Sequence, residues 1–327
     1  MEVRFVTSAG AQEHDAQDLP ALLKRGDGFV WVDVPAWDDE AESVLTDVLH
    51  LHPLVIDACR RRNHVPTVHS YVDHFFITLH TPLLGHAGHV HLLELDQVVG
   101  STFLVTVHGP LNPAVDAAEA LAETEAVLRR IRTGRLVPRS PAEVSYAVGS
   151  AIARRQRGLI GAVAEKIPEL EQQVMAGDFR QPEPLLEEMF LIRHELLTAR
   201  TMAAQSCDVY ARISTLERHA PEQDQPLLKD LADQFDRVRS IGDGESQFLF
   251  GVIELYQTRV STKMTVAMER LAVIAAITLP ITALASIYGM NVIVNERTNW
   301  IQLAIVVLVM ITISSLLLRW ARRQGWW

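Results

Sequence analysis

Two long uncharged segments near the C-terminal end constrain the fold of this chain more than any other feature. Residues 271–288 and 301–318 contain no Asp, Glu, Lys or Arg. Each run has 18 residues, which as a helix would extend about 27 Å, enough to cross the hydrocarbon core of a bilayer. A buried helical hairpin in a soluble core is the alternative, but charged residues flank both runs on their outer sides. We therefore predict two membrane-spanning helices joined by an outer loop, residues 289–300.

Basic residues around the two runs predict their orientation. Lys263 and Arg270 precede the first run, and the loop carries only Arg297. The second run is followed by Arg319, Arg322 and Arg323. Because Lys and Arg are enriched on the cytoplasmic side, we expect a multi-pass protein of the cell (inner or plasma) membrane, surrounded by lipid, with both termini cytoplasmic. The N-terminal stretch MEVRFVTSAG lacks the basic region and apolar core of a cleaved signal peptide.

The charge of the chain limits its partners. The formal net charge is −10 at pH 7, which argues against nucleic acid, since phosphate binding needs clustered Lys and Arg, and is compatible with attracting cations. Cys59 and Cys207 form neither a CxxC pair nor a disulfide framework, which suits a reducing compartment. The sequence contains no GxSxG, HExxH, GxGxxG or phosphate-loop arrangement. We therefore expect neither an enzyme nor an organic cofactor.

The residues before the first apolar run read as a water-soluble α+β region. Short β-branched or aromatic runs predict strands at 3–6, 29–34, 74–80, 91–99 and 102–108. Apolar periodicity predicts helices at 38–50, 52–62 and 113–132. Three longer helices follow at 141–176, 182–218 and 226–288, each with a proline at or near its first turn. The last would extend about 90 Å if continuous.

One uncharged stripe runs along the first predicted span and the helix before it. Steps of three or four residues back from Gly289 reach Thr265, Met268, Leu271, Ala275, Leu279, Thr282 and Ser286. This spacing keeps all of them on one side of a helix. A packing seam of small residues is one interpretation. The other is a pore lining, in which hydroxyls contact an ion's water shell and the larger apolar residues form a constriction. A pore would require several copies of the chain.

The turn after this span reads Tyr288-Gly289-Met290-Asn291. Glycine readily ends a helix, and so a plain Gly-Asn helix stop is the simplest interpretation. Asn291 also offers neutral oxygen acceptors at the outer mouth of a pore. Because magnesium sheds its water reluctantly, a ring of neutral oxygens would bind the hydrated ion without trapping it.

The sequence YGMN, placed between a proline-containing span and a second span, resembles the CorA family of divalent-cation channels. The segment VIELYQTRVSTKMTVAMERLAVIAAITLPITALASIYGMN is similar to that family's stalk helix and pore helix. Further upstream, HPLVIDACRRRNHVPTVHSYVDHFFITLH and TFLVTVHGP are similar to its N-terminal α/β domain. The resemblance thus covers most of the chain.

This resemblance implies a homopentamer with a funnel-shaped cytoplasmic part, in which a layered α/β/α domain precedes a long stalk helix and two C-terminal transmembrane helices. The expected domains are 1–135 (α/β), 136–225 (antiparallel helical pair), 226–270 (stalk) and 271–327 (spans, outer loop and basic tail). Gly289, Met290 and Asn291 match the family's selectivity motif, and the uncharged stripe matches its pore lining. The implied function is a magnesium channel, with cobalt and nickel as further ions, that conducts hydrated cations inward and is gated by intracellular divalent cation.

Three departures from the family pattern keep other functions open. Thr265 stands where Asn is common, Ser286 stands where Gly is common, and the loop VIVNERTNW replaces the usual MPEL, leaving Glu296 as its only acid. The alternatives are a proton-coupled zinc transporter of the same architecture and a membrane-anchored cation sensor that does not conduct. Met290 favours the magnesium and cobalt branch, because the zinc branch typically has GIN.

Asp230, Asp233 and Asp236 are spaced three residues apart on the predicted stalk. A solvated helix face is the simplest interpretation. The resemblance implies instead that Asp230, with Asp233 as a neighbour, takes part in a regulatory magnesium site between subunits. Glu94 and Asp96 are the candidates for its partner in the α/β domain.

Histidines are concentrated in the α/β domain. Eight of the 13 lie at positions 64, 69, 74, 80, 86, 89, 91 and 108. Imidazole suits zinc, but GHAGH is also typical of a hairpin tip, and no cysteine joins the cluster.

Overall fold

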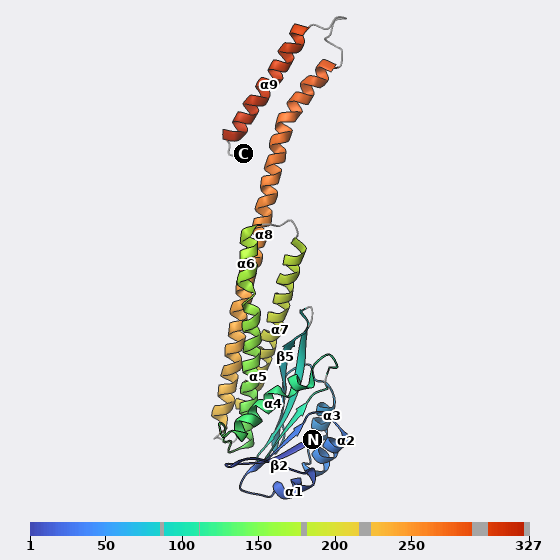
Figure 1. Cartoon of the computed structure of the whole chain (residues 1–327), viewed down its shortest axis with the longest axis vertical. Helices are drawn as coiled ribbons and strands as arrows, with labels where there is room; N and C mark the ends of the chain where they lie inside the picture. Colours follow the sequence, from blue (N-terminus) through green and yellow to red (C-terminus); the bar gives the residue numbers. More distant parts are fainter. Residues whose placement is uncertain (86–87, 111, 178–181, 216–223, 290–299, 324–327) are drawn as a thin grey trace. The chain divides into compact units, whose positions relative to one another are not determined.

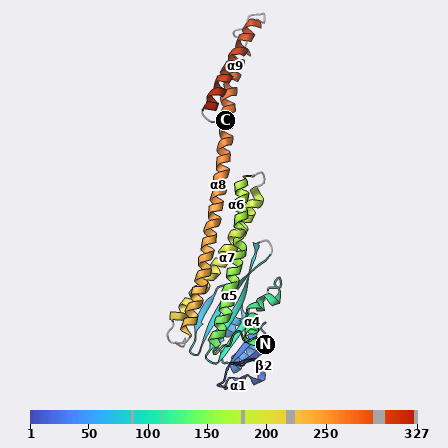
Figure 2. The same ribbon diagram turned by 60° about the vertical axis from the view of Figure 1, so that its left-hand side comes forward.

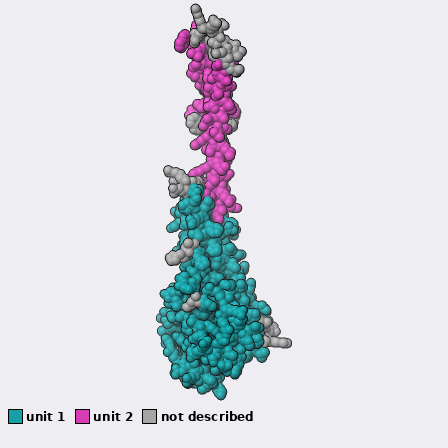
Figure 3. Space-filling model, turned by 90° about the vertical axis from the view of Figure 1, so that its right-hand side faces the viewer, with its two compact units in different colours: residues 1–175, 180–252 teal, residues 176–179, 253–327 magenta. Residues whose placement is uncertain are grey.

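The computed structural model describes the chain except residues 86–87, 111, 178–181, 216–223, 290–299 and 324–327. It divides into two compact units, coloured separately in Figure 3. Unit 1 comprises residues 1–175 and 180–252, and unit 2 comprises residues 176–179 and 253–327. Helix α8 (Gln225–Gly289) begins in unit 1 and continues in unit 2.

A seven-stranded mixed sheet forms the centre of unit 1, with strand order β2-β1-β3-β7-β6-β5-β4. Strands β3 and β7 pair in parallel, and the other neighbours pair antiparallel. The strands are β1 (Glu2–Thr7), β2 (Gly10–His14), β3 (Phe29–Val34), β4 (Thr67–Ser70), β5 (His74–Leu84), β6 (Val90–Gly100) and β7 (Phe103–His108).

Five of these strands match the sequence prediction, whereas β2 and β4 were not predicted. The two strands lie at the edges of the sheet. Strand β2, GAQEH, has no buried residue, and β4 buries only Val68. Neither carries the apolar alternation from which strands are predicted. Their pairing with β1 and β5 therefore comes from the neighbouring strands rather than from their own composition.

The central strand β3 shows why both faces of the sheet are covered. All six residues of FVWVDV are buried. Alternate side chains point to opposite faces, so Phe29 and Trp31 join one core while Val30, Val32 and Val34 join the other. The sheet therefore lies between two helical layers, as the predicted α/β/α arrangement requires (Figures 1 and 2).

Short helices cover one face of the sheet and long helices cover the other (Figure 1). The first layer contains α1 (Leu19–Leu22), α2 (Asp39–Ser43) and α3 (Pro53–Arg60), with a π-turn at Val44–Val48 and a 3-10 turn at Ala16–Asp18. The second layer contains α4 (Ala117–Arg132), α5 (Pro141–Ala164), α7 (Pro182–Thr215) and the start of α8. Helix α6 (Ile167–Ala176) follows α5 after a two-residue break.

This break corrects the single helix predicted over 141–176. Two residues, Glu165 and Lys166, separate α5 from α6, and their amides bond to Gly161 O and Val163 O. The start of α5 follows its sequence signals, because the Ser140 side chain accepts a bond from Glu143 N and Pro141 occupies the first turn. The apolar helical spacing continues past the break, because Ile167 and Leu170 are buried. The sequence pattern therefore does not reveal the break.

Glycines inside α8 do not interrupt it. A Cβ at Gly242 would lie 3.1 Å from Arg200 Cβ and 3.3 Å from Ile160 Cδ1. The small residue therefore permits the close approach of α7 to α8. This contact offsets the usual helix penalty of about 1 kcal/mol for glycine.

Unit 2 holds the rest of α8 and helix α9 (Trp300–Arg323). Both α8 and α9 contain stretches long and apolar enough to cross a membrane, with mean hydropathies of 1.9 and 2.3. Their apolar side chains are exposed on the single chain, with Leu271 66% and Leu279 67% accessible. The alternative of a hairpin buried in a soluble core is therefore wrong.

Candidate functional site

The uncharged stripe lies on one face of α8. At 100° per residue, its seven members fall within an arc of about 120°. Met268, Leu271 and Leu279 are among the most exposed apolar residues of the chain. Helix α8 contains Pro280 in its interior and remains one helix through it. The stripe is therefore continuous from Thr265 to Ser286 and consists of apolar and hydroxyl groups only.

The threonines of this stripe are oriented by backbone bonds. Thr265 Oγ1 donates to Ser261 O at 3.1 Å, and Thr282 Oγ1 donates to Thr278 O at 2.8 Å. The hydroxyl proton is thus held by the helix, while the oxygen keeps lone pairs that can accept from water. Such a surface can bond to an ion's hydration shell without binding the bare ion.

Gly289, the first residue of the predicted selectivity motif, is the last residue of α8. Among the described residues, a Cβ there would meet no atom within 4 Å, so close packing against them does not demand glycine at this position. Met290 and Asn291 lie outside the described residues.

Asp230 occupies a defined polar cluster near the start of α8. Its Oδ2 accepts a bond from the Tyr146 hydroxyl at 2.7 Å and from Gln234 Nε2 at 2.6 Å. The Tyr146 bond, followed by the Gln234 bond, lowers the pKa of Asp230 below its ordinary value. The lowered pKa favours the ionised carboxylate, and within the described residues Oδ1 has no hydrogen bond. Asp233 is exposed on the same helix.

Sequence reasoning did not anticipate Tyr146, which lies 84 residues from Asp230. The contact between Gln234 and Asp230 can be predicted from the sequence, because residues four positions apart on a helix face each other. Asp236, the third acid of the spacing, instead pairs with Arg239 at 2.6 Å.

Glu94 and Asp96 are poor partners for a neighbouring chain. Asp96 is fully buried and accepts a bond from Thr78 Oγ1 at 2.6 Å. Glu94 is 6% exposed and accepts bonds from Asn63 N and Nδ2, both at 2.8 Å. Burial raises the pKa of both carboxyls, and Glu94 raises that of Asp96 further. In the single chain both carboxyls therefore bond to groups within the α/β domain.

The histidines are dispersed rather than gathered at a metal. Among the described residues, no three His, Cys, Asp or Glu side chains could hold one ion together. His80 Nε2 bonds to Asn63 O at 2.7 Å, and His108 lies between Asp33 and Ala120 O. His89 lies at the β5–β6 hairpin tip, as predicted, and its ring meets His91 edge to face. His86 lies outside the described residues.

A layered mixed-sheet domain, a long helix with an uncharged stripe and a second apolar helix are the architecture of a two-span membrane protein. The chain belongs to the CorA family, since the model described as "CorA-like Mg2+ transporter protein" matches residues 26–323. It is thus a CorA-like divalent-cation transporter.

Relatives agree with this assignment. The chain is 23% identical over 330 residues to the cobalt/magnesium transport protein CorA of Thermotoga maritima, covering 96% of this chain and 89% of that one. Its fold is similar to the CorA magnesium transporter from Methanocaldococcus jannaschii (TM-score 0.80, 17% identity, 100% and 99% covered). It is also similar to the ZntB cytoplasmic domain from Vibrio parahaemolyticus (TM-score 0.59, 10% identity, 80% and 98% covered).

Proposed function

We propose that this chain forms a homopentameric channel that conducts hydrated magnesium, with cobalt and nickel as further ions, into the cytoplasm. The observation that carries the proposal is the uncharged stripe of α8, which runs without a charged residue to Gly289. In a ring of five chains this stripe faces the axis and supplies no fixed charge that would trap a divalent ion.

The chemistry of the stripe suits a hydrated ion. Threonine and serine oxygens accept bonds from its water, while Met268, Leu271 and Leu279 narrow the path and close it by dewetting. Asn291 supplies a ring of neutral oxygens at the outer mouth. Both termini are cytoplasmic, so inward flow follows the membrane potential. A divalent ion gains about 4.6 kcal/mol per 100 mV, twice the single-charge value.

Intracellular magnesium gates this channel through Asp230 and Asp233. Asp230 is ionised at cytoplasmic pH, since its pKa is lowered further below the ordinary value, and its Oδ1, which has no hydrogen bond within the described residues, is the hard oxygen ligand that magnesium prefers. Bound cation joins neighbouring stalks and holds the pore shut, whereas repulsion between unliganded carboxylates loosens them.

The test is magnesium uptake into liposomes containing the full chain, with and without an inside-negative potential. Asn291→Ala should abolish uptake and leave the oligomer intact on size-exclusion chromatography. Asn299→Ala is the matched control, because it removes an asparagine from the same loop outside the motif and should retain uptake. Undiminished flux in Asn291→Ala refutes the proposal.

A zinc transporter of the same architecture is the second candidate, supported by the fold likeness to the ZntB cytoplasmic domain and by the single acid of the outer loop. Two measurements separate the candidates. Uptake of each metal is measured in the presence of the other, and a proton-sensitive dye inside the liposomes reports whether protons move with the metal. Zinc uptake that moves protons identifies the second candidate. Absence of flux for every ion, with cation binding retained, identifies a sensor.

A further inference from the structure

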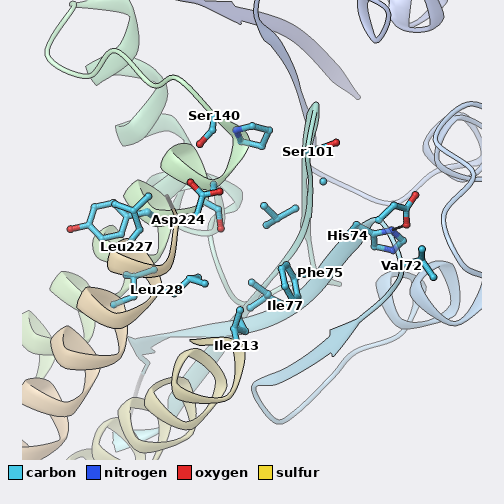
Figure 4. A pocket seen from close by; sticks show the side chains of 18 residues that line it. Val72, His74, Phe75, Ile77, Ser101, Ser140, Ile213, Asp224, Leu227 and Leu228 are labelled. Carbon is cyan, nitrogen blue, oxygen red and sulfur yellow. Dashed lines mark hydrogen bonds and ion pairs between the residues drawn. The ribbon is translucent and has the colours of Figure 1, made fainter. Parts of the chain in front are cut away.

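Unit 1 contains a cavity of about 450 Å³ between the sheet and the helices of its second layer. Figure 4 shows Phe75 and Ile77 of β5 on one side and Leu228 of α8 on the other, with Ile213 of α7 at its edge. The walls are mainly apolar, and Val99 and Leu231 extend them. A cavity of this kind fits the apolar body of a small molecule.

Two carboxylates line this cavity: Asp73, which is 70% exposed, and Asp224, which is buried. Asp224, directly before α8, is only 9% exposed, and Figure 4 places its carboxylate across the cavity from Phe75 and Ile77. Its main-chain oxygen accepts from Leu227 N and Leu228 N. Within the described part of the chain, its side chain has neither a hydrogen bond nor an ion pair. Burial raises the pKa of Asp224, and nearby Glu143 raises it further.

A mostly buried carboxylate with no partner among the described residues loses free energy when it is ionised, and a cation beside it would offset that loss. Hydrated magnesium does not suit this place, because it requires oxygen ligands or water on all sides and most of the wall is apolar. An anion is disfavoured by Asp224 and Glu143 together. The remaining class is a cation with an apolar body.

We propose that this cavity binds a small organic ammonium compound, whose charged head pairs with Asp224 and whose apolar part packs between Phe75, Ile77 and Leu228. The occupant contacts both the sheet and the first turns of α8. The cavity shares Tyr146 with the Asp230 cluster, but it contains no residue of the stripe, and the proposed binding does not depend on conduction.

The test uses the full chain in lipid nanodiscs and three probes of similar shape: 2-phenylethylammonium, neutral 2-phenylethanol and anionic 3-phenylpropionate. Isothermal titration and thermal unfolding are measured for each. The ammonium probe should bind and raise the Tm, and the alcohol and the acid should bind at least about tenfold more weakly, because a buried charged hydrogen bond is worth about that factor.

Two variants locate the site. Asp224→Asn keeps the shape and removes the charge, so it should weaken the ammonium probe at least about tenfold. Leu228→Trp keeps the charge and fills the cavity, so it should abolish binding. Asp73→Asn, at a carboxylate that also lines the cavity but is 70% exposed, is the matched control and should bind as wild type does.

The proposal is overturned if wild type does not bind the ammonium probe, if the alcohol binds equally well, or if Asp224→Asn and Asp73→Asn behave alike. Partition of the probe into lipid would affect all variants equally, so Asp224→Asn and Asp73→Asn would then give the same result. None of these readouts involves ion flux, so they leave the channel proposal untouched.

Discussion

The bond between Tyr146 and Asp230 offers a quantitative test of the cluster at the start of α8. Tyr146→Phe removes only the hydroxyl that donates to Asp230 Oδ2 at 2.7 Å. A hydrogen bond to a charged group contributes about 1.5–3 kcal/mol. Both side chains are partly exposed, and solvent screening reduces this value. We therefore expect a loss of about 1–2 kcal/mol in the free energy of unfolding.

The pH dependence of this loss has a definite sign. The bond to Tyr146 is the largest cause that lowers the pKa of Asp230. A carboxyl with a lowered native pKa adds stability above its unfolded pKa of about 3.9, and this stability is lost as the pH falls through the native value. The difference in the free energy of unfolding between wild type and Tyr146→Phe should therefore have its full size at pH 7 and become smaller below about pH 4.

A double-mutant cycle isolates the interaction. Tyr146→Phe, Asp230→Asn and the double variant are unfolded thermally as full chains in nanodiscs at pH 7. Each kcal/mol corresponds to about 2–4 °C in Tm for a unit of this size. The coupling energy should be about 1–2 kcal/mol, mostly from this one bond. Additive effects of the two substitutions would refute the reasoning.

The remaining predictions concern helix packing and a buried carboxyl. Gly242→Leu should lower stability by about 1–3 kcal/mol, because its Cβ already lies 3.1 Å from Arg200 Cβ. Gly244→Ala, whose Cβ meets no atom within 4 Å, should raise stability by about 0.5–1 kcal/mol; thermal unfolding compares the two, and equal effects would contradict the packing argument. Asp96 has a raised pKa from burial, so wild type should lose stability as the pH rises from about 4. In Asp96→Asn the free energy of unfolding should change less with pH between pH 5 and pH 8. The same pH dependence as in wild type would contradict this prediction.

The pattern of residues along the chain was sufficient to predict those elements whose formation depends on residues adjacent in the sequence. The strands β3, β5, β6 and β7 were predicted because β-branched and aromatic residues follow one another there. The break at Glu165 was not, because buried Ile160 and Val163 before it and Ile167 and Leu170 after it keep the apolar helical spacing. Strands β2 and β4 were missed for the opposite reason, since their pairing partners, not their own residues, create them.

The sequence by itself determined the two apolar helices and the uncharged stripe, because length, absence of charge and helical spacing are properties of a continuous segment. Tertiary structure decided the surroundings of individual carboxyls. Tyr146 reaches Asp230, Thr78 reaches the buried Asp96, and Phe75 faces Asp224 across a cavity. Tyr146 and Asp230 are 84 residues apart, Thr78 and Asp96 lie on neighbouring strands, and Phe75 and Asp224 belong to different layers of the domain. Burial and hydrogen bonding, which set the charge state and chemistry of a carboxyl, arise only when distant elements pack together.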